Sequence, residues 1–483
     1  MENKSSGRTA SRIASIDALR GLTILVMIFV NDVAGVTGTP PWMHHWKFDS
    51  VTGVHDYAAN GMTFVDWVFP GFLFIVGMAI PFALGRRMDR GESLRQVWGH
   101  IGVRTLGLLL IGVFMVNAGA MSDEGRLPRV VWALLMYLMV ILVWNTGPKE
   151  PGGLRTATNA MRGVGILGLV ALAVFFHGSS DPASIAGRPA WWGVMALVSV
   201  VALAVTLLVA QRGRGPSGVV PVMGLLCGLY FFDAIGFLSG EWQIDMRPSW
   251  WGILGLIGWA YLVACVAYTL FRKQPAALMG VVALLYCLFF ADKVGTFSGW
   301  PLRNRIDFGS MLGSHAAITL SGVLLGIMLL PDSPVQGHWR RIRWATLYGL
   351  GLFVGGVLLY QLQGVDAVHD MFKINKNAAT PTWCLISSAI TVWIWVVLYV
   401  IMDVVGFSAW TIVFKPAGEN PLFAYILHPI VIYAAVLLGE AGWNLYAELG
   451  DSFQTGLWRS IVVALGVTWL VGGMRRVGIW LRL

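Results

Sequence analysis

The sequence predicts an all-α fold, a polytopic bundle of about 14 transmembrane helices with both termini in the cytoplasm. Three observations predict it. Of the 483 residues, 57% are hydrophobic and only 12% are charged, whereas a soluble domain carries about 25% charged residues. Apolar runs recur from residue 21 to residue 474 without a long polar break, and basic residues gather between those runs. This pattern excludes a water-soluble enzyme and favours a single domain over residues 1–483.

The apolar runs divide into fourteen candidate spans. A bilayer core of about 30 Å requires about 20 apolar residues per helix, and fewer where neighbouring helices shield a span. Each span must be helical, because lipid offers no partner to a free backbone N–H or C=O group. The spans begin near Gly21, Thr63, Ile101, Arg129, Gly163, Ala190, Gly218, Trp250, Ala276, Gly313, Trp344, Trp383, Pro421 and Thr455.

The positions of the 34 Lys and Arg residues predict the orientation. With the N-terminus inside, the inner segments hold 23 of these 34 residues, and basic residues near span ends resist translocation. We therefore expect residues 1–20 to be a cytoplasmic tail rather than a cleaved signal, and residues 32–62 to form an outer loop. Because the net charge of +9 lies in loops, the expected partner is a lipid bilayer and no nucleic acid is expected.

Two glycine patterns and the cysteines have structural interpretations. The motif Gly163-x-Gly165-x-x-Gly168 has dinucleotide-binding spacing, but it follows no strand and opens an expected membrane helix. Gly252, Gly255 and Gly258 recur every three residues, which favours close helix packing. The four cysteines lie in apolar runs without metal-ligand spacing, so we expect reduced thiols and no metal site.

Polar side chains concentrate at the ends of the first two expected spans. Asn31 lies at the outer end of the first span, and Asp66 lies just inside the second. A polar group at membrane depth is costly unless it is paired or used, so both are candidates for function. Asp17 and Arg20, three residues apart at the inner end of the first span, are as consistent with a structural ion pair.

Three histidines occupy the loop between these two spans. Imidazole is the side chain best suited to accept a proton near neutral pH, which makes His44, His45 and His55 candidates for a general base. All three cannot be the base, and a histidine in a wet loop is more often an ordinary surface residue. The residues alone leave the choice open.

A series of motifs runs along the chain. They are SIDALRG at 15–21, FVN at 29–31, NGMTFVDWVFPGFLFIVG at 60–77, RLP at 126–128, INKNAATPTW at 374–383 and GENPLFAYI at 418–426, followed by a basic terminal tail. In these motifs the chain resembles the heparan-α-glucosaminide N-acetyltransferase family, and in particular its bacterial glucosamine-acetylating members of the NagX type. The resemblance covers most of the chain.

The resemblance implies an acetyl-CoA-dependent amino-sugar N-acetyltransferase of the bacterial inner membrane. Acetyl would pass from cytoplasmic acetyl-CoA to the amine of glucosamine on the periplasmic side. In the family, a histidine of the first outer loop and the asparagine that ends the preceding helix serve the transfer. Asn31 matches that asparagine, and the spacing Trp42-x-x-His45 ranks His45 first. His55, closer to the NG of residues 60–61, ranks second and His44 third.

Roles for these residues follow from the chemistry of acetyl transfer. His45, or in its place His55, would take a proton from the ammonium form of the sugar, and Asn31 would donate a hydrogen bond to the oxyanion. Asp66 would hold the histidine ring. The inner-face cations available to the phosphates of CoA are Arg20, Arg104, Arg86 and Arg87.

Three further residues are candidates for binding the sugar. Asn375 and Asn377 at the outer entrance suit sugar hydroxyls, although capping the following helix explains them equally well. His315, at the outer end of the tenth span, is either a second polar group facing the sugar or a satisfied helix-end histidine.

Two other activities stay open at this stage. An amino-sugar transporter would also have many spans, although no internal repeat is visible in this chain. An O-acyltransferase would modify hydroxyls of surface polysaccharide instead of an amine. The sequence leaves the oligomeric state open, a homo-oligomer included.

Overall fold

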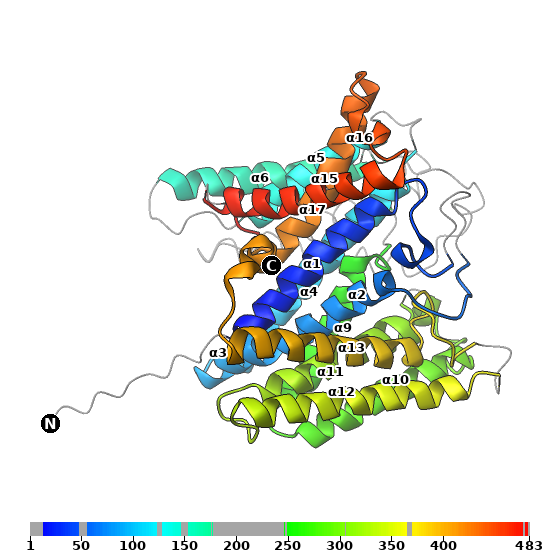
Figure 1. Ribbon diagram of the computed structural model, residues 1–483. Coiled ribbons are helices and arrows are strands. Elements are labelled where there is room, and N and C mark those ends of the chain that lie inside the picture. The colour runs from blue at the N-terminus through cyan, green and yellow to red at the C-terminus, as the bar shows by residue number, and fades with distance from the viewer. Residues whose placement is uncertain are drawn as a thin grey trace. The chain divides into compact units, whose positions relative to one another are not determined.

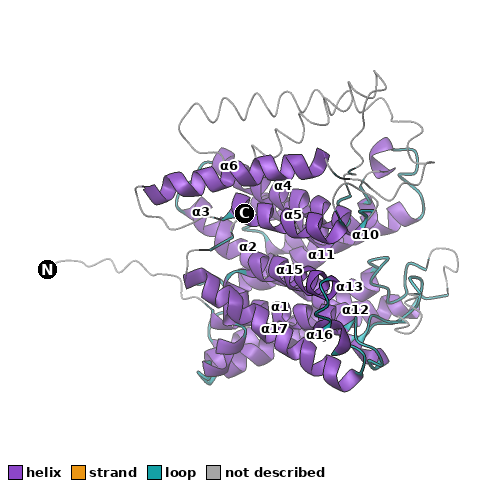
Figure 2. Ribbon diagram, turned by 90° about the horizontal axis from the view of Figure 1, so that it is seen from above, coloured by secondary structure: helices purple, strands orange, loops and turns teal. Residues whose placement is uncertain are grey.

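The computed structural model describes residues 13–47, 56–122, 128–145, 153–174, 176, 246, 249–304, 306–364, 370–476 and 479–481. Within these ranges the chain is helical and contains no strand, only one isolated bridge between Asn145 and Leu481. Figure 2 shows the same result, because every coloured element is a helix or a loop. The predicted all-α class is therefore confirmed for the described part of the chain.

Figure 1 shows the described helices in chain order, coloured from blue to red. They are α1 (Ala14–Val33), α2 (Phe64–Ile80), α3 (Arg86–Asp89), α4 (Leu94–Gly119), α5 (Arg129–Trp144), α6 (Gly153–Val174), α9 (Ile253–Phe271), α10 (Pro275–Lys293), α11 (His315–Met328), α12 (His338–Gln361), α13 (Pro381–Tyr399), α14 (Lys415–Glu419), α15 (Pro421–Glu440), α16 (Leu445–Glu448) and α17 (Phe453–Arg476). Short π-helical segments, Pro81–Gly85, Phe308–Ser314 and Val400–Val404, extend α2, α11 and α13.

Ten helices in the described ranges are long and apolar enough to cross a membrane, and each lies at a predicted span. Two more predicted spans coincide with shorter apolar helices, Arg129–Trp144 and Met161–Ala173. The spans predicted near Ala190 and Gly218 lie outside the described residues. An integral membrane bundle is thus supported, while the count of fourteen and the side on which the termini lie stay predictions.

The chain forms two compact units. The first comprises Met1–Trp98, Trp259–Pro421 and Leu449–Trp469, and the second comprises Gly99–Gly258, Leu422–Glu448 and Leu470–Leu483. Most of the residues singled out from the sequence belong to the first unit. The prediction of one domain for residues 1–483 stays a prediction.

The core of the first unit is the pair α2 and α11, which pack through glycines. A Cβ atom at Gly77 would collide with the carbonyl oxygen of Thr319, and one at Gly322 would collide with that of Phe74. Glycines at such contacts let two helix backbones approach closely. In the apolar window of Phe308–Met328, which includes α11, 94% of the residues are buried, against 17% in the window of α12. In this unit α11 is therefore central and α12 peripheral.

The two ends of α1 are fixed by different contacts. Near its start, a Cβ atom at Gly21 would lie 2.5 Å from the carbonyl oxygen of Phe414, so the SIDALRG motif packs directly against the segment before α14. At its other end, Asp32 is buried and accepts hydrogen bonds from Arg459 Nε at 3.2 Å and Ser460 Oγ at 2.6 Å. These two residues lie on α17, so α17 is tied to the last turn of α1.

In the second unit the glycines serve packing, as predicted. A Cβ atom at Gly112 of α4 would lie 2.8 Å from the backbone nitrogen of Gly255 on α9, and one at Gly258 would lie 3.2 Å from Leu109. Gly165 lies in the middle of the continuous helix α6, where its added Cβ atom would be 2.9 Å from the carbonyl oxygen of Met139. The motif of residues 163–168 is therefore not a strand-to-helix phosphate loop.

Candidate functional site

The site is built on the first turn of α2. Thr63 caps the helix, because its Oγ1 accepts a hydrogen bond from the backbone N–H of Val65 at 3.2 Å. Asp66, three residues later, accepts the backbone N–H of Thr63 at Oδ2, 3.0 Å away. This reciprocal capping places the Asp66 carboxylate, which is only 2% exposed, at the N-terminal rim of the helix.

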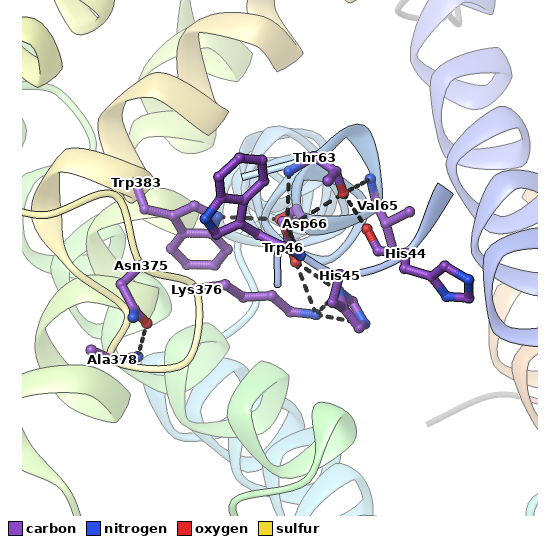
Figure 3. A network of polar contacts seen from close by, with 10 residues as sticks. All are labelled: His44, His45, Trp46, Thr63, Val65, Asp66, Asn375, Lys376, Ala378 and Trp383. Carbon is purple, nitrogen blue, oxygen red and sulfur yellow. Dashed lines mark hydrogen bonds and ion pairs between the residues drawn. The ribbon is translucent and has the colours of Figure 1, made fainter. Parts of the chain in front are cut away.

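Asp66 also binds the loop that precedes α2 (Figure 3). Its Oδ1 lies 2.6 Å from His45 Nδ1, and its Oδ2 accepts the backbone N–H of Trp46 at 3.0 Å. The Thr63 hydroxyl donates to the backbone carbonyl of His44 at 2.6 Å. Because an ionised carboxylate only accepts, the short contact indicates that Nδ1 of His45 carries a proton.

Of the two candidate histidines in the described residues, His44 and His45, it is His45 that contacts Asp66. The side chain of His45 is 36% exposed. His44 is buried, and in Figure 3 its ring points away from Asp66. Burial and the neighbouring charge of His45 lower the pKa of His44. His55 lies outside the described residues. Asp66 and His45 are thus in contact, and the catalytic roles predicted for them stay predictions.

A cation that the sequence analysis missed completes the cluster. Lys376 Nζ lies 3.1 Å from His45 Nδ1, 3.2 Å from His45 Nε2 and 3.9 Å from Asp66 Oδ1. Burial lowers the pKa of Lys376 to about 8, although the charge of Asp66 acts in the opposite direction. Its place between the two asparagines of the INKN motif was the signal in the sequence that could have identified it.

The loop that carries Lys376 is held by Asn375. The buried amide of Asn375 donates to the carbonyl oxygens of Tyr57 at 2.8 Å and Ala59 at 3.1 Å, and its oxygen accepts the N–H of Ala378 at 2.8 Å. These bonds use both amide hydrogens of Asn375 to shape the loop. Asn377 is exposed, so of the two asparagines it is the one with a side chain open to solvent.

The structure does not bring Asn31 into contact with this cluster. Asn31 is exposed on the last turn of α1, and among the described residues no hydrogen bond joins its side chain to His45 or Asp66. Its neighbour Asp32 is instead the buried member of the pair, bound to Arg459. Arg459 lies more than four hundred residues away in the sequence, and no local pattern predicted this partnership.

His315 is buried, and its ring contacts the rings of Phe69 and Trp383. It is the first residue of α11, it is only 4% exposed, and both ring contacts are edge-on. The indole N–H of Trp383 in turn donates to the backbone carbonyl of Asp66 at 3.3 Å. His315 therefore packs against Trp383, which is hydrogen-bonded to Asp66.

The predicted inner-face cations are distributed over both units. Arg20 forms an ion pair with Asp17 at 3.1 Å, which is the structural pairing that the sequence allowed. Arg86 is exposed, and Arg87 pairs with Glu92 at 3.1 Å. Arg104 is exposed on α4 in the second unit. In the described ranges no cluster of three metal-ligating side chains occurs.

An apolar groove of about 720 Å³ adjoins the site within the first unit. Its lining comes from α1, α2, α12, α13 and the Met62–Phe64 segment, and includes Thr63, Val26, Tyr360 and Ile390. Thr63 therefore lines the groove and also donates its backbone N–H to Asp66. A nonpolar part of a ligand can approach the first turn of α2 through this groove.

Comparisons with known proteins point to one group of relatives. A family model described as "Domain of unknown function (DUF5009)" matches residues 12–223. The chain is similar to heparan-alpha-glucosaminide N-acetyltransferase of Homo sapiens, with 32% identity over 440 residues, 87% of this chain and 53% of the relative. It is similar to the Mus musculus protein of the same name, with 24% identity over 444 residues, 88% of this chain and 54% of the relative.

These matches confirm the family resemblance that the motifs predict. The chain spans about half the length of the curated relatives it matches. The assignment to the bacterial NagX type within the family stays a prediction.

Proposed function

We propose that this chain, a relative of the heparan-alpha-glucosaminide N-acetyltransferases over most of its length, is a transmembrane enzyme that acetylates the amine of glucosamine or a closely related amino sugar. The observation that carries the proposal is the contact of 2.6 Å between His45 and Asp66 at the start of a membrane-spanning helix. A carboxylate that orients an imidazole is the arrangement by which proteins build a general base.

In the proposed reaction His45 acts as the base and Asp66 as the group that holds its ring. The amine nitrogen of the sugar attacks the thioester carbon of acetyl-CoA while His45 Nε2 takes a proton from that nitrogen. The carbon–sulfur bond then breaks, the sulfur leaves with a proton returned from His45, and the products are the N-acetyl sugar and free CoA. Asp66 stays ionised and stabilises the imidazolium that forms between the two proton transfers.

The sides of the membrane are part of the proposal. Acetyl-CoA carries phosphates that cannot enter hydrocarbon, so it binds at the cytoplasmic face, where Arg20, Arg86 and Arg104 are the candidate cations. Glucosamine binds at the periplasmic face of a bacterial inner membrane, against the loop that holds His45. On this face we propose Asn31 as a donor to the oxyanion and Asn377 as a donor to sugar hydroxyls. Asn375 shapes the loop that carries Asn377.

The test measures free CoA released by the detergent-purified full chain. We expect thiol release from acetyl-CoA when glucosamine is present and none with N-acetylglucosamine, because the latter has no free amine. Release with N-acetylglucosamine would indicate an O-acyltransferase. Uptake of glucosamine into proteoliposomes without any thiol release would indicate a transporter, and either result contradicts the proposal.

The same assay separates the histidines. His45→Ala removes the base and should lower kcat by about 10²- to 10⁴-fold. His44→Ala is the matched control, because His44 is the neighbouring residue and its ring points away from Asp66. Equal activities of the two variants would show that His45 is not the base.

A further inference from the structure

We propose that Lys376 is a catalytic residue, whose ammonium group stabilises the oxyanion formed when the acceptor amine attacks the thioester. This assignment rests on the proposed function and adds Lys376, a residue to which the family resemblance assigns no role. It starts from the contacts of Lys376 with His45 and Asp66 (Figure 3).

The two distances to His45 locate the ammonium over the ring. Lys376 Nζ is 3.1 Å from Nδ1 and 3.2 Å from Nε2, so it is almost equally distant from both. An in-plane approach at equal distance would press Nζ against the ring carbon between the two nitrogens. The ammonium therefore lies over the face of the imidazole rather than in the plane of its ring.

This placement puts positive charge where negative charge develops. The attacked carbon is one bond away from the amine nitrogen, and that nitrogen must lie within hydrogen-bonding distance of Nε2 to lose its proton. The carbonyl oxygen, one further bond away, is thus within reach of an ammonium that is 3.2 Å from Nε2. A fixed cation aimed at a developing oxyanion is a large contribution to catalysis in a partly buried site.

The charges of the cluster balance at each stage only if Lys376 is included. Before attack, the carboxylate of Asp66 and the ammonium of Lys376 offset each other across 3.9 Å. After attack, the new imidazolium of His45 and the oxyanion add one charge of each sign. Without Lys376 the intermediate would hold two negative charges and one positive charge next to a carboxylate that is almost fully buried.

The loop around Lys376 is fixed on both sides, as a preorganised charge requires. On one side the backbone N–H of Ile374 donates to Asn60 Oδ1 at 2.9 Å, and the N–H of Gly61 donates to the Ile374 carbonyl at 2.8 Å. On the other side Ala379 donates its N–H to the carbonyl oxygen of Lys376 at 3.0 Å. The ammonium is therefore held against His45 by the folded loop and by Asp66.

The experiment compares Lys376→Met and Lys376→Arg with the wild-type full chain in the thiol-release assay. The matched control is Lys373→Met, because Lys373 lies in the same loop but pairs with Asp370 at 2.7 Å. Loss of Lys376 should lower kcat by about 10²- to 10³-fold with little change in the KM for glucosamine. Lys376→Arg should recover most of that loss, and Lys373→Met should retain wild-type activity.

The pH dependence of kcat distinguishes a catalytic role of Lys376 from a structural one, because a structural role would leave it unchanged. Among the described residues, the titratable and charged groups facing Lys376 are His45 and Asp66. His44 neighbours His45, and the Lys373–Asp370 pair lies in the same loop as Lys376. Wild-type kcat should fall as pH rises through about 8, because Lys376 then loses its proton. Lys376→Arg should remove that fall, because a guanidinium stays charged over this range.

Chemical rescue distinguishes loss of the ammonium group at position 376 from misfolding of the variant. Lys376→Cys, treated with 2-bromoethylamine, regains a side-chain ammonium of nearly lysine length and should regain activity, and wild type treated in the same way corrects for the exposed Cys287. Wild-type kcat in Lys376→Met, a loss confined to KM, or no rescue would overturn the role of Lys376 alone. A wild-type chain that releases no thiol with any amino sugar would refute the proposed function, and this role with it.

Discussion

At the scale of single residues, Asp66 serves both the fold and the candidate site. Its Oδ2 accepts two backbone N–H groups, from Thr63 and Trp46, and its Oδ1 contacts His45. An asparagine at this position can preserve the helix cap, because its oxygen can accept the same backbone donors. Its amide nitrogen would then face His45 Nδ1 and donate to it, which reverses the tautomer and removes the acceptor from Nε2.

Asp66→Asn should therefore leave the protein folded and lower kcat for acetyl transfer by about 10⁴-fold, the effect of a reversed tautomer in a comparable carboxylate–histidine pair. Asp56→Asn is the control, since Asp56 loses the same charge in the same loop and its Oδ1 only accepts the N–H of Ala58. Gel filtration and thermal unfolding establish that both variants are folded. Full activity in Asp66→Asn would show that the orientation of His45 by Asp66 is not required.

At this scale the sequence predicted part of the site. Asp66 was singled out because a carboxylate at membrane depth is costly unless it is paired or used. His45 was singled out because imidazole suits a general base and because the spacing Trp42-x-x-His45 fits the family resemblance. Lys376 was missed, because it lies 331 positions from His45 and only the folded loop brings the two together. Asn31 and Asp32 could not be separated by local pattern, since one residue of offset on a helix decides which side chain is buried.

At the scale of helices, the position of Asp66 depends on how α2 packs on α11. Gly322 of α11 faces the backbone of Phe74, so a methyl group there must push the two helices apart. Gly322→Ala should lower the thermal unfolding midpoint of the purified protein, because overpacking costs about 1–3 kcal/mol. It should also lower acetyl transfer, since a shift of α2 moves Asp66.

Gly351→Ala on the peripheral helix α12 is the control for that prediction. An added Cβ atom at Gly351 meets nothing within 4 Å, and alanine is the better helix former by about 1 kcal/mol. We expect an unchanged or higher unfolding midpoint, measured by intrinsic tryptophan fluorescence. Equal destabilisation by both substitutions would show that the loss reflects glycine replacement in general and not the contact between α2 and α11.

The spans themselves could be predicted from sequence, because membrane helices are specified by a local property, a run of apolar residues of bilayer length. The partners of those helices could not. The approach of Gly21 to Phe414 and that of Gly77 to Thr319 depend on backbone surfaces that no composition window reports. Boundaries near 81–85 and 400–404 were also unpredictable, since π-helical segments continue the apolar pattern without a sequence break.

At the scale of the whole molecule, the proposed function requires the His45 loop and the inner-face arginines to lie on opposite sides of the membrane. One helical segment of 26 residues, Phe64–Asp89, follows the His45 loop and carries Arg86 and Arg87 in its last turn. At 1.5 Å per residue it extends about 39 Å, more than the hydrocarbon core of about 30 Å. Its two flanks therefore emerge on different faces if the segment crosses the bilayer.

Labelling of single cysteines with a membrane-impermeant maleimide tests this arrangement and its direction. In a background with the native cysteines replaced by alanine, Tyr57→Cys and Leu94→Cys flank the segment at positions that are 67% and 60% exposed. We expect Tyr57→Cys to react in intact cells whose outer membrane has been removed, and Leu94→Cys to react only after permeabilisation, because Arg86, Arg87 and Arg90 keep their flank inside. Reaction of both cysteines from the same side would place the two flanks of this segment on one face of the membrane. The membrane-crossing mechanism would then have to be abandoned.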